Sequence, residues 1–206
     1  MRLLSCRGAD RRVVAEAADA LRDGKIIIYP TDTLYALGCD ALNARAVEKL
    51  CRLKNLNPEK NMLSIVCRDI SQAAEYTRID NKAFRMLKEY LPGAFTFILP
   101  AATKLPKVFR SRKSVGVRIP DNDFARALAD ELGNPVMSSS VEIDEGICAQ
   151  GDTLDAYAIA DRYDGSQDIA FAVDGGEMRP VPSTIVDIME SDAPTVIRQG
   201  AGIFEE

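Results

Sequence analysis

Residues 25–41 read KIIIYPTDTLYALGCDA, and this stretch decides the fold. It opens with Lys25 to Tyr29, a short apolar run rich in β-branched residues, which is typical of a strand buried on both faces. Thr31 and Thr33 follow directly after Pro30. Because ligands of open α/β sheets bind outside the ends of the strands, these two hydroxyls are candidate binding groups. The stretch therefore predicts a buried strand that leads into a polar site.

Helical and strand patterns alternate along the rest of the chain. The patterns predict helices over 10–22, 43–54, 80–91 and 121–133, and a further helix that starts at Asp152 or Thr153. They predict strands over 2–5, 62–67, 95–99, 115–119, 136–137, 169–173, 185–188 and 195–197. We expect parallel pairing in the first half, where strands alternate with helices, and antiparallel pairing among the crowded late strands.

The predicted fold is of the α/β class, with a twisted, open, mixed parallel/antiparallel sheet flanked by helices. We expect one domain over residues 1–206, because no repeat or linker-like run divides the chain. Hydrophobic residues make up 47% and charged residues 28%, as in globular proteins. No apolar run approaches the roughly 20 residues that span a bilayer, and the N-terminal segment turns charged at once, unlike a signal peptide. We therefore expect a cytoplasmic protein with no membrane partner.

The cysteine and histidine content narrows the chemistry. The five cysteines are odd in number and form no Cys-x-x-Cys pair, so we predict buried apolar residues rather than disulfides or metal ligands. Histidine is absent, which excludes Ser-His-Asp and Cys-His nucleophile pairs. It also removes the commonest transition-metal ligand. Catalysis would depend on positioning, electrostatics, carboxylates or a hard cation such as Mg²⁺, and no residue is predicted to ligate a metal.

Hydroxyls and cations recur at the ends of the predicted strands. They are Thr31 and Thr33 after the strand at 25–29, Arg118 at the end of 115–117, Ser138 to Ser140 after 135–137, Ser183 and Thr184 before 185–188, and Arg198 after 195–197. Such groups suit phosphate and carboxylate oxygens. Each of them alone could equally cap a helix or close a turn. Together they predict an anion-binding α/β domain, although the chain contains neither a Walker A pattern nor a Gly-x-Gly-x-x-Gly pattern.

The net charge of −5 argues against a protein coated with phosphate-binding cations, but it leaves room for a local basic face. Two stretches, 45–60 and 104–113, could supply one, or they could be ordinary solvated surfaces. Lys54 lies where a predicted helix ends, a position that a cation favours through the helix dipole alone. Lys60 lies in a polar loop before a strand. Both lysines are either surface residues or phosphate ligands.

The stretch from Tyr29 to Ala41 resembles the opening signature of YrdC-like proteins, the threonylcarbamoyl-AMP synthase family. The resemblance continues through Lys54, through 115–120 (VGVRIP), through Ser138 to Ser140, through 182–187 (PSTIVD) and through 196–201 (VIRQGA). These motifs occur in order over about residues 10 to 203. The resemblance implies the YrdC-like fold, which is similar to that of DHBP synthase.

The reaction that the resemblance implies joins L-threonine, bicarbonate and ATP into threonylcarbamoyl-adenylate and releases pyrophosphate. The product would serve modification of adenosine 37 in tRNA. Carried over by position, Thr33 and Lys54 would be catalytic, with Thr31 and Thr33 at the threonine substrate. The nucleotide, ATP or an AMP-like molecule with an accompanying Mg²⁺, would contact Lys60, Arg118, Ser138, Ser140, Ser183 and Arg198.

Two departures from the family pattern place the chain nearer to the YciO-like branch. The family loop usually reads Lys-x-Arg, whereas this chain has Lys54-Asn55-Leu56. The family's Ser-x-Asn is replaced by Ser140-Val141-Glu142, and a carboxylate there would repel phosphate unless it binds a cation. Arg52 is a candidate replacement for the missing guanidinium in substrate binding.

Two further readings compete with the synthase. In the first, the same fold serves as a module that binds tRNA, double-stranded RNA or nucleotide without forming an adenylate. In the second, the chain is a regulatory or structural protein with a vestigial cleft.

Overall fold

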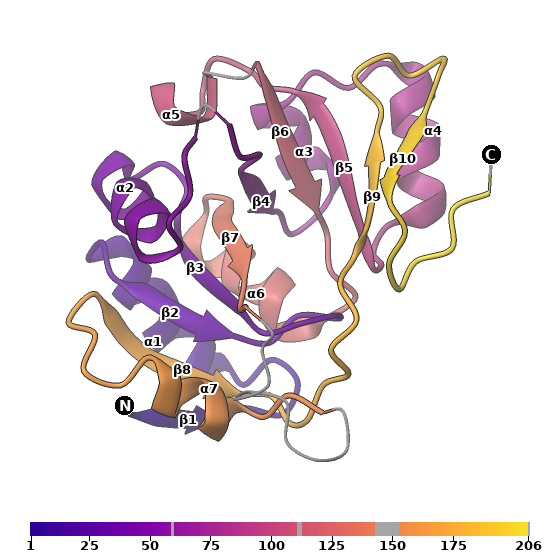
Figure 1. Ribbon diagram of the computed structural model, residues 1–206. Coiled ribbons are helices and arrows are strands. Elements are labelled where there is room, and N and C mark those ends of the chain that lie inside the picture. The colour runs from indigo at the N-terminus through magenta and orange to yellow at the C-terminus, as the bar shows by residue number, and fades with distance from the viewer. Residues whose placement is uncertain (59, 111–112, 143–152, 206) are drawn as a thin grey trace.

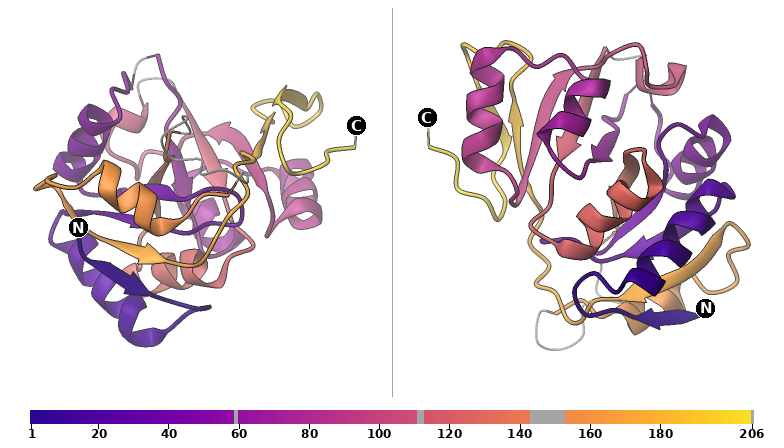
Figure 2. Two further views of the ribbon diagram at one scale, coloured as in Figure 1. Left: turned by 60° about the horizontal axis from the view of Figure 1, so that its bottom comes forward. Right: turned by 180° about the vertical axis from the view of Figure 1, so that it is seen from behind.

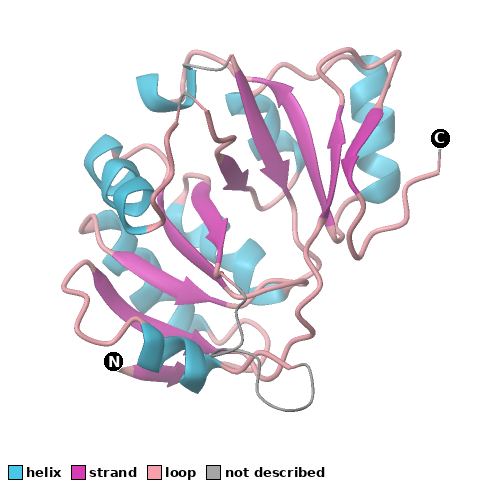
Figure 3. Ribbon diagram, in the orientation of Figure 1, coloured by secondary structure: helices cyan, strands magenta, loops and turns pink. Residues whose placement is uncertain are grey.

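A ten-stranded mixed sheet organises the protein in the computed structural model, which describes residues 1–58, 60–110, 113–142 and 153–205. The strand order is β1-β8-β2-β3-β7-β4-β6-β5-β9-β10, and Figures 1 and 3 show its twist. The strands are β1 (Leu3–Ser5), β2 (Ile26–Tyr29), β3 (Ala36–Asp40), β4 (Ser64–Val66), β5 (Phe95–Pro100), β6 (Ser114–Arg118), β7 (Val136–Ser140), β8 (Ile169–Asp174), β9 (Thr184–Asp187) and β10 (Thr195–Arg198).

Helices cover both faces of the sheet. They are α1 (Arg11–Arg22), α2 (Ala44–Leu53), α3 (Ile70–Tyr76), α4 (Asn81–Tyr90), α5 (Lys107–Arg110), α6 (Asp123–Leu132) and α7 (Ala156–Arg162). Helices α1, α3, α4 and α6 lie on the rear face, which is turned toward the viewer on the right of Figure 2. Side chains of Asp10, Asn43, Asp69, Asp80 and Asn122 accept hydrogen bonds from backbone N–H groups at five helix N-termini, which fixes where these helices start.

The sheet is mixed, as predicted, but the distribution of strand directions differs from the expectation. The early strands β2 and β3 pair antiparallel. The late strand β8 pairs parallel with β1 and β2, and β9 pairs parallel with β5. The late strands β9 and β10 pair antiparallel with each other, as expected. The prediction failed because it assumed that strands close in sequence also pair, whereas β8 and β9 insert beside strands from the first half.

Several elements differ from the sequence prediction. Strand β3 and helices α3 and α5 were not predicted, and β7 extends through Ser140 rather than ending at residue 137. Helix α6 starts at Asp123 with Asn122 as its cap, not at Asp121. Helix α7 starts at Ala156 with Asp155 as its cap, so Thr153 does not start it, and Asp152 lies outside the described residues.

The core lies on both sides of the sheet and includes the four described cysteines. Cys6, Cys39, Cys51 and Cys67 are free and buried, and burial raises the pKa of each thiol. The prediction that these four pack as apolar residues is confirmed, whereas Cys148 lies outside the described residues. Within the described ranges, no helix has the length and apolar character to cross a membrane.

Candidate anion-binding site

Arg118 ends strand β6, and its guanidinium lies against the turn that follows strand β2. Its Nη2 donates to Asp32 Oδ1 at 2.6 Å and to Thr33 Oγ1 at 2.9 Å. The Arg118 side chain is 6% exposed and that of Asp32 is 8% exposed. Nε of Arg118 is buried and has no hydrogen-bond partner among the described residues. An unpaired buried donor is costly, and the protein encloses this one without an acceptor among the described residues.

The turn after β2 holds Asp32 and Thr33 in place through Thr31. Thr31 Oγ1 accepts hydrogen bonds from the N–H groups of Thr33 and Leu34 and donates to the carbonyl of Leu34 at 2.6 Å. Asp32 is fixed from its other side, because its Oδ2 accepts from the backbone N–H of Asp121 at 2.9 Å. The hydroxyl of Thr31 therefore closes a turn, which is the structural alternative recognised from the sequence.

Arg198 reaches the same region from the end of strand β10. Its Nη2 donates to the carbonyl of Ser183 at 2.8 Å and to Ser183 Oγ at 3.4 Å. Ser183 Oγ lies 2.9 Å from Thr96 Oγ1 on β5. Partial burial and the positive charge of Arg118 both lower the pKa of Arg198. Arg198 contacts only neutral groups in the part of the chain that the structure describes.

The two arginines line one pocket, which we call the serine–arginine pocket. Its volume is about 190 Å³, and it is lined by Leu56, Met62, Leu63, Ser64, Thr96, Arg118, Met137, Ser138, Ser139, Ser140, Ser183, Ile185 and Arg198. Strands β4, β5, β6, β7, β9 and β10, with residues that precede β4 and β9, bring these side chains together. Five of the predicted nucleotide-binding residues are thereby assembled: Arg118, Ser138, Ser140, Ser183 and Arg198.

The floor of the serine–arginine pocket depends on Gly116 in β6. A Cβ atom at this position would lie 2.5 Å from Ser64 Oγ and 2.9 Å from Thr96 Cγ2, which is too close for either contact. Ser138 is fixed from below, because the buried hydroxyl of Tyr29 donates to Ser138 Oγ at 2.7 Å. Close packing of strands therefore sets the positions of these hydroxyls.

Lys54 caps the end of helix α2 and is paired within the chain. Its side chain is 5% exposed, and its Nζ donates to Glu142 Oε1 at 3.1 Å. The sequence expectation was that Glu142 would repel phosphate unless it bound a cation, and the cation it binds is Lys54. Leu56, which stands where the family pattern has arginine, lines the serine–arginine pocket instead.

The other predicted substrate and nucleotide ligands lie outside this pocket. Arg52 and Lys60 are exposed on and after α2, and neither lines the serine–arginine pocket. Thr31 and Thr33, with Asp32, line a neighbouring hollow of about 570 Å³ that also contains Met178 and Arg179. The roles assigned to all of these residues stay predictions.

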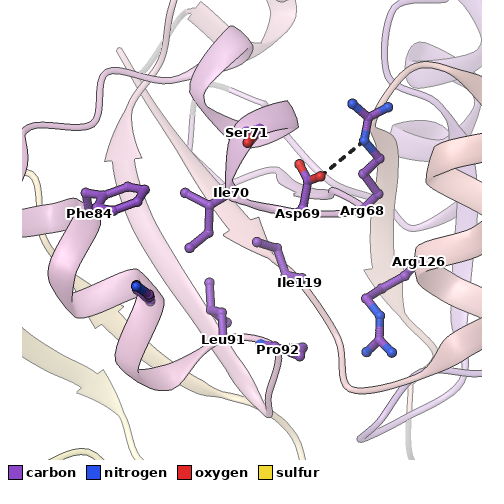
Figure 4. Close-up of a pocket in the computed structure, with 10 residues that line it drawn as sticks. Arg68, Asp69, Ile70, Ser71, Phe84, Leu91, Pro92, Ile119 and Arg126 are labelled. Carbon is purple, nitrogen blue, oxygen red and sulfur yellow. Dashed lines mark hydrogen bonds and ion pairs between the residues drawn. The ribbon is translucent and has the colours of Figure 1, made fainter.

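A separate hollow on the rear of the sheet, which we call the rear pocket, contains none of the predicted residues. It measures about 470 Å³ and is drawn in Figure 4, with Arg68, Asp69, Ile70, Ser71, Phe84, Lys88, Leu91, Pro92, Ile119 and Arg126 around it. Its arginines already have acidic partners: Arg68 pairs with Asp69 and Asp130. Arg126 pairs with two aspartates and donates to the carbonyl of Pro120.

The sequence analysis missed four polar residues at the site: Tyr29, Asp32, Ser64 and Thr96. Two of them lie inside the quoted stretch, where Asp32 between two threonines was a detectable signal for a carboxylate near the anion ligands. Ser64 and Thr96 carried no such signal, because single hydroxyls within apolar strands are common.

Two carboxylates near the site already pair with cationic side chains, so they are not free to ligate a metal ion. Asp32 pairs with Arg118, and Glu142 pairs with Lys54. Among the described residues, no group of three or more His, Cys, Asp or Glu side chains gathers as metal ligands would. The described side chains therefore do not fit a Mg²⁺ ion held by the protein.

The mixed sheet and the serine–arginine pocket define an α/β protein with a hydroxyl-lined pocket that contains two arginines at strand ends. Comparison with known sequences identifies its family. The chain belongs to the Sua5/YciO/YrdC family, whose model carries the description "Telomere recombination" and matches residues 19–200.

Two relatives illustrate its place in this family. YciO of Escherichia coli K12, an uncharacterised protein, is 35% identical over 194 residues, which cover 93% of this chain and 91% of YciO. The threonylcarbamoyl-AMP synthase of Bacillus subtilis is 34% identical over 197 residues. These cover 94% of this chain but 54% of the synthase, so the chain spans about half of that enzyme.

Solved structures give the same picture. The crystal structure of E. coli YciO matches with a TM-score of 0.85 and 32% identity, over 98% of this chain and 97% of YciO. The crystal structure of Pyrococcus abyssi Sua5 complexed with L-threonine matches with a TM-score of 0.83 and 28% identity, over 97% of this chain and 58% of Sua5. The predicted family and fold are confirmed.

Proposed function

We propose that this protein is a nucleotidyltransferase that joins L-threonine, bicarbonate and ATP into threonylcarbamoyl-adenylate and releases pyrophosphate. The observation that carries the proposal is the convergence of Arg118 and Arg198 on one hydroxyl-lined pocket. Support also comes from relatives named threonylcarbamoyl-AMP synthase and from the similarity to Sua5 complexed with L-threonine. The product would serve tRNA modification.

The electrostatics of the pocket suit a phosphate chain. Burial and then the positive charge of Arg118 lower the pKa of Arg198. An anion bound beside both guanidinium groups would offset this repulsion. The hydroxyls of Ser138, Ser140 and Ser183 add donors that adapt to phosphate oxygens. Hydrogen bonds that involve charged groups are the stronger ones.

The chemical step needs no histidine. Bicarbonate loses hydroxide to give CO₂, and the amine nitrogen of threonine forms an N–C bond to its carbon. The proton that the nitrogen loses combines with the hydroxide as water, which leaves a carbamate. A carbamate oxygen then attacks the α-phosphorus of ATP, and the bond from that phosphorus to the bridging oxygen of pyrophosphate breaks. Negative charge builds up on the leaving pyrophosphate, where the arginines would stabilise it. Holding the carbamate oxygen close to the α-phosphorus of ATP would lower the activation barrier further.

Threonine would lie beside the turn after β2 in this proposal. Thr33 Oγ1 accepts a hydrogen bond from Arg118 at 2.9 Å, which fixes the position of this hydroxyl. Lys54 would attract the carboxylate of the amino acid. We propose Thr31 as a residue that positions Thr33, because its own hydroxyl is engaged in the turn.

The decisive test is pyrophosphate release that requires ATP, L-threonine and bicarbonate together. The protein is incubated with all three and with each omitted in turn, and the new adenylate is identified by its mass. The proposal predicts product only in the complete mixture. Release at the background level in the complete mixture would contradict the synthase. If nucleotide binding were retained in that case, the result would favour the non-enzymatic module for nucleotide or RNA.

A further inference from the structure

Lys54 and Glu142 form an ion pair between a buried cation and an exposed anion. The Lys54 side chain is 5% exposed, whereas that of Glu142 is 63% exposed. Burial of an ammonium group without an anion is strongly unfavourable, so the ammonium needs a partner in every state of the protein. In the structure that partner is Glu142, at 3.1 Å.

Glu142 also has a second cation within reach. Its other oxygen, Oε2, lies 3.9 Å from Nη2 of Arg162 at the end of α7. Arg162 is 32% exposed. Glu142 therefore lies between two positive groups, and it can leave Lys54 without losing every favourable charge contact. Lys54 has no such freedom, because its side chain is enclosed.

This asymmetry has a consequence for any ligand that approaches Lys54 with a negative group. Such a ligand must take the place of the Glu142 carboxylate, and both anions cannot share the ammonium without repulsion. Glu142 lies two residues beyond Ser140, which lines the serine–arginine pocket, and Leu56 of that pocket lies two residues beyond Lys54. Lys54 and Glu142 do not line that pocket themselves, but each is two residues along the chain from one that does.

We propose that Glu142 is a specificity-determining residue, an internal carboxylate that an anionic ligand group, carboxylate or phosphate, has to displace from Lys54. The inference rests on the proposed function in one respect, which is that Lys54 belongs to the ligand site. It goes further by making affinity at that position depend on the side chain of Glu142. The position tolerates neutral ligand groups while Glu142 is in place, and it binds anions only after exchange.

The test measures binding of two probes, inorganic pyrophosphate and L-threonine, by calorimetry. Glu142→Gln keeps the shape of the side chain and removes its charge, and it should bind at least one probe about fivefold to tenfold more tightly than the native protein. A gain for pyrophosphate alone assigns Lys54 to a phosphate, and a gain for threonine alone assigns it to the carboxylate. Unchanged or weaker binding, or no binding to either protein at millimolar probe, would overturn the proposal.

Two controls separate displacement from a general change of charge. Glu89→Gln removes an exposed carboxylate on α4 that lines neither the serine–arginine pocket nor the hollow beside Thr33, and it should leave both affinities within about twofold. In a Lys54→Met background, Glu142→Gln should give no gain, because there is no cation to compete for. A gain that persists without Lys54 would overturn the proposal.

The same experiment distinguishes its own failure from failure of the synthase. Probe binding requires no turnover, so a protein that forms no adenylate can still show the gain in Glu142→Gln. Thermal unfolding adds a second measurement: without a probe Glu142→Gln should melt lower, since Lys54 has lost its partner. Saturating pyrophosphate or threonine should raise its melting temperature more than that of the native protein. An equal rise in both proteins would contradict the exchange.

Discussion

The serine–arginine pocket and the rear pocket are each lined by two arginines, but these arginines differ in the groups they pair with. In the rear pocket Arg68 and Arg126 are paired with exposed aspartates. In the serine–arginine pocket Arg118 is enclosed with Asp32, and Arg198 contacts only neutral groups in the described part of the chain. Cationic side chains around a hollow are therefore a poor guide to anion binding, and the partners of the cations are a better one.

Strand β6 separates these two environments by a single residue. Arg118 ends the strand and lines the serine–arginine pocket, while the next residue, Ile119, lines the rear pocket. Successive side chains of an extended chain point to opposite faces of a sheet. The same short segment thus supplies a cation to one face and an apolar side chain to the other, which makes matched substitutions on the two faces informative.

The largest effect is expected from Arg118→Met. It leaves the enclosed Asp32 carboxylate without its cation, and breaking a buried pair in this way costs about 3–5 kcal/mol of the free energy of unfolding. Nucleotide binding should be lost as well. Urea unfolding measures the first effect and calorimetry the second. The control is Arg68→Met in the rear pocket, where exposed partners make the pair nearly dispensable. Equal losses in the two variants would contradict the comparison.

Arg198→Met should separate binding from stability. Arg198 has no carboxylate partner among the described residues, and its pKa is lowered by its environment, so its loss should change the unfolding midpoint little. A charge-assisted hydrogen bond to phosphate contributes about 1.5–3 kcal/mol, so affinity for ATP should fall by roughly 10- to 150-fold. Arg126→Met should leave that affinity unchanged. Retained affinity in Arg198→Met would remove Arg198 from the site.

The smallest effect concerns Tyr29 below the serine–arginine pocket. Burial raises its pKa to about 12, so the folded protein holds the phenol proton more tightly than the unfolded chain, whose tyrosines titrate near pH 10. This contribution is complete below about pH 10 and is lost as the pH rises from 10 to 12. Tyr29→Phe should therefore lose less stability than the native protein over this window, in urea unfolding at each pH.

At neutral pH the same variant should lose about 1 kcal/mol, because the hydrogen bond to Ser138 is gone. Burial also raises the pKa of Tyr35 to about 12. Its contribution to the pH dependence of the free energy of unfolding remains in this variant and serves as an internal reference. Parallel stability curves for the native protein and Tyr29→Phe between pH 10 and 12 would show that Tyr29 does not contribute.

Local patterns in the sequence located most strands and the polar residues that follow them. The apolar run before Pro30 and the positions of Arg118 and Arg198 at strand ends were readable because each depends on a few neighbouring residues. Strand β3 was missed because Ala36 to Asp40 mixes apolar, glycine and acidic residues. Its backbone pairs with a strand on each side, β2 and β7. These pairings stabilise the strand although its residues have little β propensity of their own.

The pairings at the site could not be predicted, because they join residues that are far apart in the chain. Arg118 and Asp32 are separated by 86 positions, and Lys54 and Glu142 by 88. Family resemblance gave the positions of Arg118, Lys54 and Glu142 but not their partners, and Asp32 was missed. The ion pair between Lys54 and Glu142 could be recognised only from the structure. The proposed specificity depends on this pair.

One measurement tests the central claim most directly: a crystal structure with a non-hydrolysable ATP analogue. The account predicts phosphate oxygens within hydrogen-bond distance of the guanidinium groups of Arg118 and Arg198, with the serine hydroxyls around them. Phosphates bound in the rear pocket beside Arg68 or Lys88, with the serine–arginine pocket free of the analogue, would contradict it.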